Sequence, residues 1–328
     1  MTSIKNKSMC FKEKVVRLSR IDADDDSFRI TTENNLDDLA SSIKHLGLLN
    51  LPLLLEQKTG YTIIFGFRRI EACRRLNWSE VSARVLNSDT DPLKCVTYAI
   101  TDNTFQRPLN IIEKSRCIKM LSVFYKDGDT LTQVLPVLGI SDHPVMIKKI
   151  KTVYDMPERL QNSILSNTIS LPMALELSSL SRDDVEGFVK LFNALKLSLN
   201  KQREVLTIVK EIAVREDISV MHVLEASPLK EILTNKNLDQ NQKTRNIRIY
   251  LKRRRFPAIT AAEQSFQKHL KKLNTGKEMK LIPPVNFESS TYTLKLTFNN
   301  MTELKDLKTA FDALIENPHL KKIISDSF

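Results

Sequence analysis

The chain has 328 residues, 41% hydrophobic and 27% charged, which is the balance of a globular protein with about two domains. No run of 18 consecutive apolar residues occurs, so we expect no membrane-spanning helix and no membrane partner. The polar N-terminal residues lack the apolar stretch of a secretory signal, and the four cysteines are too widely spaced for a zinc knuckle or a disulfide framework. These features predict a cytoplasmic protein with reduced thiols.

The formal net charge of +11 is concentrated in one stretch. Residues 243–280 hold twelve Lys and Arg against two acidic residues, a net +10, so the other 290 residues sum to +1. A local block of positive charge favours an anionic partner.

Residues 15–100 have the pattern of a mixed α/β domain. Short β-rich runs predict strands over 15–18, 51–55, 61–65 and 82–86. Apolar residues at helical spacing predict a helix over 36–46, ended by Gly47, and a second helix over 69–76.

From residue 92 to about 272 the pattern is helical. Two segments of helical length, 131–138 and 142–153, flank a Gly-Ile-Ser turn and predict a helix-turn-helix. Further helix starts are expected at Ser170 with Pro172 and at Ser227 with Pro228.

A polar linker over 235–242 and a proline pair at 283–284 divide the remaining chain. The strict alternation over 291–298 predicts a half-buried strand, and Asn300 with Glu303 resembles a capping box before a last helix. The exposed edge of this strand–helix module favours a dimerisation or partner surface, although the same pattern also suits intramolecular closure.

The segment from Tyr61 to Leu76 suits a polyphosphate. It contains a strand, Gly66, the arginines Arg68 and Arg69, and a helix start. Glycine lets the backbone approach a ligand closely, the helix N-terminus offers unpaired amides, and guanidinium groups donate in pairs. A solvated basic face of an amphipathic helix has the same pattern, and the residues alone leave both interpretations open.

Four ordered motifs resemble the ParB/RepB family of chromosome and plasmid partition proteins. Residues 66–72 (GFRRIEA) resemble the family's GERRxRA box, and residues 36–52 resemble its helix ending in SIxxxG and the strand that follows. Residues 102–113 are similar to its ENxQRxxLNPxE motif, and residues 154–174 to the helices after its helix-turn-helix. The resemblance covers about residues 15–180 in the family's order.

The resemblance implies a nucleotide site, because members of the family bind CTP with Mg²⁺, hydrolyse it slowly and use it to close a dimeric clamp on DNA. Carried over to this sequence, the nucleotide-binding residues are Gly66, Arg68, Arg69, Asn103, Gln106 and Arg107. Asn103 takes the Mg²⁺ position, and Asp102 replaces the glutamate needed for hydrolysis. An acid and an amide beside a metal-bound triphosphate can orient water.

Several residues depart from the family pattern. Phe67 replaces the glutamate of the arginine box, and Glu71 replaces an arginine. The Gln106-Arg107 pair lies one residue further from Asn103 than in the family motif, and Asp102 is one methylene shorter than glutamate. We expect phosphate binding to survive these changes; CTP hydrolysis and the preference for cytosine are left open.

Two segments are candidates for DNA contact. The family places DNA recognition in the helix-turn-helix, whose second helix carries Lys148, Lys149 and Lys151 but begins with an Asp-His-Pro sequence that is poor for base reading. A structural helical hairpin is the alternative. The second segment is a basic arm with four consecutive cations, Lys252, Arg253, Arg254 and Arg255. Such cations suit the phosphates of DNA of any sequence, although a solvated helix face has the same pattern.

We therefore expect an α+β fold in four parts. Residues 1–100 form a small mixed α/β ParB-like domain, 101–234 an all-helical region with the helix-turn-helix, 235–280 a linker and basic helical arm, and 281–328 a small strand–helix module. The expected partners are DNA, a nucleotide, a second copy of the chain and, by resemblance, a partner ATPase, in a bacterial, nucleoid-associated setting. Partition and gene regulation both remain open as roles.

Two other functions suit the same residues. A nucleotide-dependent phosphotransferase resembling kinases or sulfiredoxin-like enzymes would use the arginines to position a nucleotide for transfer, although no catalytic nucleophile is evident. A scaffold that has lost nucleotide binding would keep only DNA or protein contacts, and Phe67 with the displaced Gln106-Arg107 pair favours it.

Overall fold

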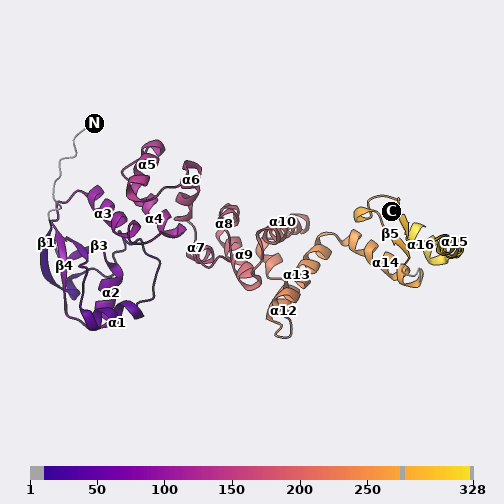
Figure 1. Cartoon of the computed structure of the whole chain (residues 1–328), viewed down its shortest axis with the longest axis horizontal. Coiled ribbons are helices and arrows are strands. Elements are labelled where there is room, and N and C mark those ends of the chain that lie inside the picture. The colour runs from indigo at the N-terminus through magenta and orange to yellow at the C-terminus, as the bar shows by residue number, and fades with distance from the viewer. Residues whose placement is uncertain (1–10, 274–277, 326–328) are drawn as a thin grey trace. The chain divides into compact units, whose positions relative to one another are not determined.

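The structure is a computed structural model that describes residues 11–273 and 278–325. The chain divides into two compact units, Met1–Val189 and Lys190–Phe328 (Figure 1). No helix among the described residues is long and apolar enough to cross a membrane.

The first unit is built on a four-stranded sheet. Its strands are β1 (Lys12–Arg17), β2 (Leu53–Glu56), β3 (Tyr61–Phe65) and β4 (Glu80–Leu86). The order is β1-β4-β2-β3, with β2 parallel to β4 and the other two pairs antiparallel. All four predicted strands are therefore present, and β3 spans the predicted residues because each of its five side chains is buried.

Helices cover both faces of this sheet. The neighbouring residues Leu53 and Leu54 of β2 are fully buried in two different cores, as the alternation of a strand requires. One core includes Ile43 of α1 (Asp37–Leu46) and Ile70 of α2 (Phe67–Arg75). The other includes residues of α3 (Pro92–Thr104) and α4 (Ile111–Leu121).

The predicted helix-turn-helix packs on the second of these cores. It consists of α5 (Gly128–Val134), a 3-10 helix (Leu135–Leu138) and α6 (Pro144–Val153). Gly139 has a φ of 81° at the turn, a value that favours glycine. Leu131, Leu135 and Ile147 share one core with α3 and α4, so this segment is continuous with the sheet domain. The helices that follow are α7 (Glu158–Leu165), α8 (Leu171–Leu177) and α9 (Arg182–Leu195).

The second unit begins with a helical part. Its helices are α10 (Leu199–Glu216), α11 (Val220–Leu224), α12 (Ser227–Thr234) and α13 (Gln240–Arg255). The next helix, α14 (Pro257–Leu273), packs on the C-terminal part and contributes Phe266 and Leu273 to its core. The linker predicted over residues 235–242 is shorter in the structure, because α13 begins at Gln240. Asp239 caps this helix in a capping box with Gln242. The expected cap at Ser227 is wrong by one residue, since Ala226 occupies the cap position.

A two-stranded sheet and two helices form the C-terminal part of the second unit. They are β5 (Met279–Ile282), a 3-10 helix (Val285–Phe287), β6 (Thr293–Leu296), α15 (Met301–Ile315) and α16 (Pro318–Ser325). The predicted strand and last helix are present, and the Asn300 side chain accepts a hydrogen bond from the Glu303 amide as expected. β5 and α16 were not predicted; alternate residues of β5, Met279 and Leu281, enter the core of this part.

Candidate functional site

A cavity of about 330 Å³ lies in the first unit, within the range of small-molecule sites. Its walls come from the loop before α1, the second half of α1 and the loop after it, the start of α2, and the end of α3 with the residues that follow. Seven of its lining residues are those that the two motifs predicted for nucleotide binding and hydrolysis: Gly66, Arg68, Arg69, Asp102, Asn103, Gln106 and Arg107. The fold thus brings together residues that lie up to 41 positions apart.

Gly66 begins α2 in a left-handed conformation, with φ 94° and ψ 21°. A Cβ atom at this position would lie 2.8 Å from Cβ of Pro52, so both the space and the backbone require glycine. No side chain caps the helix, and the first amides of a helix have no partners within it. The turn can therefore present backbone donors to an anion at the cavity.

Arg68 is held by the loop that precedes α1. Its Nη1 donates to the Glu33 carboxylate at 2.7 Å, and its Nη2 donates to the backbone oxygen of Asn35 at 2.7 Å. The Nε of Arg68 is buried and has no hydrogen-bond partner among the described residues. A buried donor without a partner is costly, and an anion in the cavity would be a partner of suitable chemistry.

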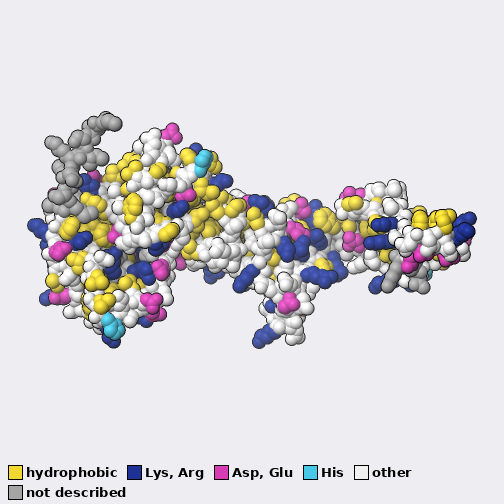
Figure 2. All heavy atoms as spheres, in the orientation of Figure 1, with side chains coloured by type: hydrophobic (Ala, Val, Ile, Leu, Met, Phe, Trp, Pro, Cys, Tyr) yellow, Lys and Arg dark blue, Asp and Glu magenta, His cyan; other side chains and the backbone are white. Residues whose placement is uncertain are grey.

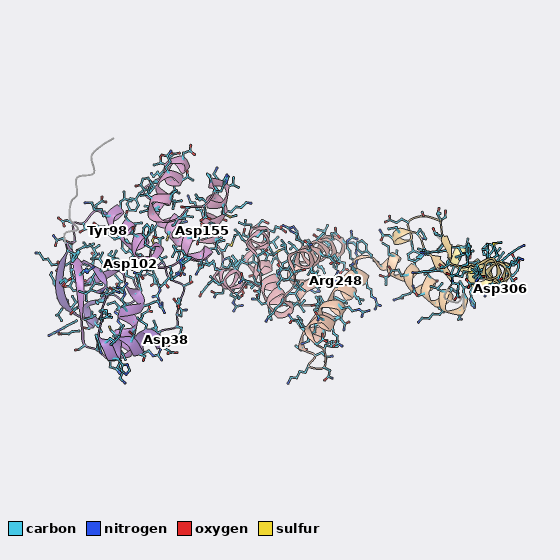
Figure 3. All side chains as sticks on the ribbon, viewed as in Figure 1. Asp38, Tyr98, Asp102, Asp155, Arg248 and Asp306 are labelled. Atoms are coloured by element: carbon cyan, nitrogen blue, oxygen red, sulfur yellow. The ribbon has the colours of Figure 1, made fainter. Side chains whose placement is uncertain are left out.

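Arg69 lies deeper and joins α2 to the end of α3. It donates to the backbone oxygens of Asn50 and Leu51 at 3.1 and 3.2 Å, and its Nη2 lies 3.3 Å from Oδ2 of Asp102. Gln106 donates to the other carboxylate oxygen of Asp102 at 3.0 Å. Figure 3 labels Asp102 in the first unit.

Burial determines the protonation behaviour of this pair. It raises the pKa of Asp102 above its usual value, although Arg69 and the hydrogen bond from Gln106 act in the opposite direction. Burial likewise lowers the pKa of the Arg69 guanidinium. A carboxylate with a raised pKa is a better proton acceptor near neutral pH than an ordinary aspartate.

Arg107 forms a two-pronged ion pair with a buried carboxylate. Its Nη1 and Nη2 donate to the two oxygens of Glu113 at 2.7 and 2.6 Å, and the Glu113 side chain is only 1% exposed. Glu113 also accepts from the amides of Thr32 and Asn110. Burial opposes the charge, yet the bonds from Arg107 and these amides lower the pKa of Glu113 below its usual value.

Asn103 offers an oxygen at the cavity. Its Nδ2 donates to the Ala99 carbonyl at 2.8 Å, which fixes the amide and leaves its side-chain oxygen without a donor among the described residues. Within residues 11–273 and 278–325, no three His, Cys, Asp or Glu side chains gather as a metal site would require. A divalent cation at Asn103 would therefore need ligand oxygens from a nucleotide and from water.

The two departures in the arginine box share one partner. Phe67 is buried, and the Arg29 guanidinium lies 5.4 Å from the centre of its ring. The same guanidinium forms an ion pair with Glu71 at 2.6 Å. Arg29 thus contacts both Phe67 and Glu71, and these two departures from the family motif leave Arg68 and Arg69 at the cavity.

Three contributors to this site were not predicted from the sequence. Glu33 and Asn50 lie in loops whose composition carries no signal for their contacts with Arg68 and Arg69. Glu113 could have been found, because Asn110 with Glu113 three residues later is a capping-box pattern, and the structure contains that box.

The predicted DNA-contacting lysines of α6 lie on its exposed side. α6 buries Ile147, Ile150 and Val153, and Lys148, Lys149 and Lys151 are exposed without an acidic partner among the described residues. His143 caps the helix by accepting from the Val145 amide at 3.3 Å. Asp142 is bound to Lys114 at 2.7 Å.

The basic arm forms α13, and most of its cations are paired with glutamates of α10. Arg254 binds Glu216 at 2.6 Å, and Arg255 binds Glu211 at 2.8 Å. Lys252 and Arg248 both bind Glu204, at 3.2 and 2.7 Å. Arg253 is exposed and has no ion-pair partner within the described part of the chain.

Figure 2 shows basic and acidic side chains together over α13, and Figure 3 labels Arg248 there. The local charge count of +10 omitted the glutamates of α10, because each lies 38 or more positions before the cation that it pairs with.

A four-stranded mixed sheet with an arginine-bearing strand–helix turn, continuous with a helix-turn-helix, defines an α+β class of protein. A family model described as the ParB N-terminal domain matches residues 5–104. A probable chromosome-partitioning protein ParB of Campylobacter jejuni is 28% identical over 217 residues, 66% of this chain and 75% of the relative. The corresponding Helicobacter pylori protein is 24% identical over 176 residues, 54% of this chain and 59% of the relative.

Solved ParB structures are also similar. A truncated ParB of Caulobacter crescentus complexed with CTP-gamma-S has 18% sequence identity and a TM-score of 0.26, covering 55% of this chain and 98% of that one. The same protein complexed to the centromeric parS site has 17% identity and a TM-score of 0.31, covering 64% and 96%. Residues 5–104 thus match the ParB N-terminal domain, and a longer part of the chain is similar to these curated ParB relatives.

Proposed function

We propose that this chain is a DNA-binding ParB protein whose first unit binds a nucleoside triphosphate, CTP with Mg²⁺, as a switch. The observation that carries the proposal is the convergence of seven motif residues on one cavity of about 330 Å³. Residues from two separate sequence motifs gather there, which a solvated helix face would not require.

The cavity fits a polyphosphate by the chemistry of its donors. Because Gly66 has no side chain, a ligand can approach the backbone at the start of α2 closely. The buried Nε of Arg68 has no partner among the described residues. Arg68 and Arg69 would hold phosphate oxygens, while the neighbouring amides at the helix start add donors. Arg107, which already binds both oxygens of Glu113, would contribute positive potential and position rather than a free guanidinium.

Asn103 would hold Mg²⁺ through its side-chain oxygen, and Asp102 would accept a proton from water. When bound, the metal ion neutralises phosphate charge and polarises the phosphoryl group. The raised pKa of Asp102, caused first by burial, suits a proton acceptor, and its bonds to Arg69 and Gln106 fix its orientation. Slow hydrolysis is part of the proposal, and phosphate release measured with Asp102→Asn tests it.

DNA would contact the exposed cations of α6 and α13. The three unpaired lysines of α6 suit phosphates beside a groove, and Lys252 and Arg253 are the exposed pair among the four predicted cations of the basic arm. A clamp needs two copies of the chain. The C-terminal part offers exposed apolar side chains for this contact, including Phe298, Met301 and Phe311, and a measurement of mass in solution tests the homodimer.

The deciding experiment is calorimetric titration of the full chain with CTP, ATP, GTP and ADP in the presence of Mg²⁺, with and without duplex DNA. We expect selective heat with CTP. Arg68→Ala and Arg69→Ala should each weaken binding more than tenfold, because each removes a charge-assisted donor from the cavity.

Arg75→Ala is the matched control, since Arg75 belongs to the same helix, pairs with Asp37 at 2.6 Å and does not line the cavity. Wild-type affinity in Arg75→Ala with lost affinity in the other two supports the phosphate site. Unchanged affinity in Arg68→Ala and Arg69→Ala would overturn it.

The same titration separates the two other functions. Turnover of ATP or ADP with an acceptor would indicate a phosphotransferase, and no heat with any nucleotide would indicate a binding scaffold. The structure offers the phosphotransferase no nucleophile at Cys73, which is fully buried and whose pKa is raised by that burial.

A further inference from the structure

The N-terminal end of α6 presents apolar side chains where a recognition helix usually presents polar ones. Val145 and Met146, the second and third residues of the helix, are 56% and 39% exposed. In a helix-turn-helix, the residues at this end of the second helix are those that reach base edges in the major groove.

Two polar side chains at the same end have partners within the chain. Asp142 is bound to Lys114, and the Nδ1 atom of His143 accepts the Val145 amide. Pro144 has no side-chain donor or acceptor. The Asp142 carboxylate is therefore held by Lys114, and the exposed His143 ring has its Nδ1 atom engaged as a helix cap.

Charge identifies DNA as the occupant of this apolar end. Lys148, Lys149 and Lys151 follow it on the same helix, exposed and without acidic partners among the residues that the structure describes. Figure 2 shows hydrophobic and basic side chains together at the position of α6. Apolar side chains flanked by cations match a groove whose floor carries thymine methyl groups and whose walls carry phosphates.

We propose that α6 reads thymine C5-methyl groups in the major groove through Val145 and Met146, so that the preferred DNA has A·T pairs facing this helix. The proposal rests on the proposed DNA-binding function and adds the chemistry of its specificity. Each buried methyl group adds a hydrophobic contact that cytosine, which lacks the methyl, does not supply.

The test uses the full chain and duplex DNA selected by it from a random-sequence pool. The selected duplex is synthesised again with deoxyuridine in place of thymidine, which removes the methyl groups and keeps every hydrogen-bonding edge. We expect affinity, measured by fluorescence anisotropy, to fall about fourfold for each methyl group removed from the interface.

Variants assign this effect to α6. Val145→Ala with Met146→Ala should bind the thymidine and deoxyuridine duplexes equally, since both side chains are exposed and their loss leaves the core intact. Val123→Ala is the control, because this valine is 67% exposed and lies outside the helix-turn-helix; it should keep the wild-type ratio. Equal affinity of the wild-type chain for both duplexes would overturn the proposal.

The lysines separate this proposal from the function on which it rests. Replacing Lys148, Lys149 and Lys151 with glutamine should weaken both duplexes alike and flatten the salt dependence. If the triple variant weakens binding while the wild-type chain ignores the methyl groups, α6 binds DNA and only the methyl reading fails. If the triple variant binds as the wild type does, α6 does not touch DNA, and both the methyl reading and the DNA contact proposed for α6 fail.

Discussion

Arginines are placed in two different ways in this molecule. In the first unit, Arg68, Arg69 and Arg107 are paired with acids around a cavity. In the second unit, Arg248, Arg254 and Arg255 are paired with acids across two packed helices. Ion pairing is common to both regions, so it does not distinguish a binding site from a structural contact. A binding site is distinguished instead by a cavity and by a donor without a partner. The arginines of the first unit have both, in the cavity that they line and in the buried Nε of Arg68.

The sharpest contrast between the regions is in burial. We expect Arg107→Ala to lower the free energy of unfolding by about 3 kcal/mol, because it leaves the buried Glu113 carboxylate without its cation. Arg254→Ala should cost about 1 kcal/mol or less, as for other pairs near the surface. Urea denaturation of the full chain measures both. Equal losses of unfolding free energy would show that the Arg107–Glu113 pair stabilises the fold no more than the Arg254–Glu216 pair does.

Acid should abolish the contribution of Glu113. Its folded-state pKa lies below the usual 4.5, so the stabilisation is complete above that value and is lost as pH falls through the lower folded pKa. Glu113→Gln should therefore be less stable than the wild type at neutral pH and should approach it at strongly acid pH. A difference independent of pH would mean that packing rather than charge is involved.

The cavity also depends on the backbone geometry at Gly66, whereas the ion pairs of the basic arm depend on side chains. Gly66→Ala forces a Cβ against Pro52 at a positive φ, so we expect a loss of about 2 kcal/mol in stability and of nucleotide binding. Gly128→Ala is the control, because a Cβ there meets nothing within 4 Å. Denaturation and calorimetry on both variants measure the effect; wild-type behaviour of Gly66→Ala would refute the close approach.

The smallest expected effect concerns the arm itself. Lys252→Gln with Arg253→Gln should flatten the log–log salt dependence of DNA binding by about 0.9 for each phosphate that the arm no longer neutralises, without sequence preference. Arg254→Gln with Arg255→Gln should change this slope less, because these side chains bind Glu216 and Glu211. The opposite ranking would mean that DNA displaces the glutamates of α10.

Much of the first unit could be predicted from local pattern. β3 and α1 follow from buried apolar residues and a glycine stop, and both motifs of the cavity follow from the family resemblance. The loop partners Glu33 and Asn50 could not be predicted, because their contacts depend on tertiary packing rather than on spacing.

The second unit was less predictable for a related reason. β5 begins at the end of the basic stretch, and its four residues are too few for an alternating pattern to be recognised. The charge of α13 was counted over a local window, whereas Glu204, Glu211 and Glu216 come from α10. Local counts describe composition, and the field at a surface depends on neighbours in space.

Oxygen atoms of the chain itself already accept hydrogen bonds from the arginines of the cavity. The carboxylates of Glu33 and Asp102 and the carbonyl oxygens of Asn35 and Asn50 already occupy the guanidinium groups of Arg68 and Arg69. A guest anion that uses these same N–H groups must displace those oxygens, whereas the Nε of Arg68 has no partner among the described residues to displace. We therefore predict that a triphosphate, which brings many oxygens at once, displaces these contacts more readily than a chloride ion or a single phosphate does.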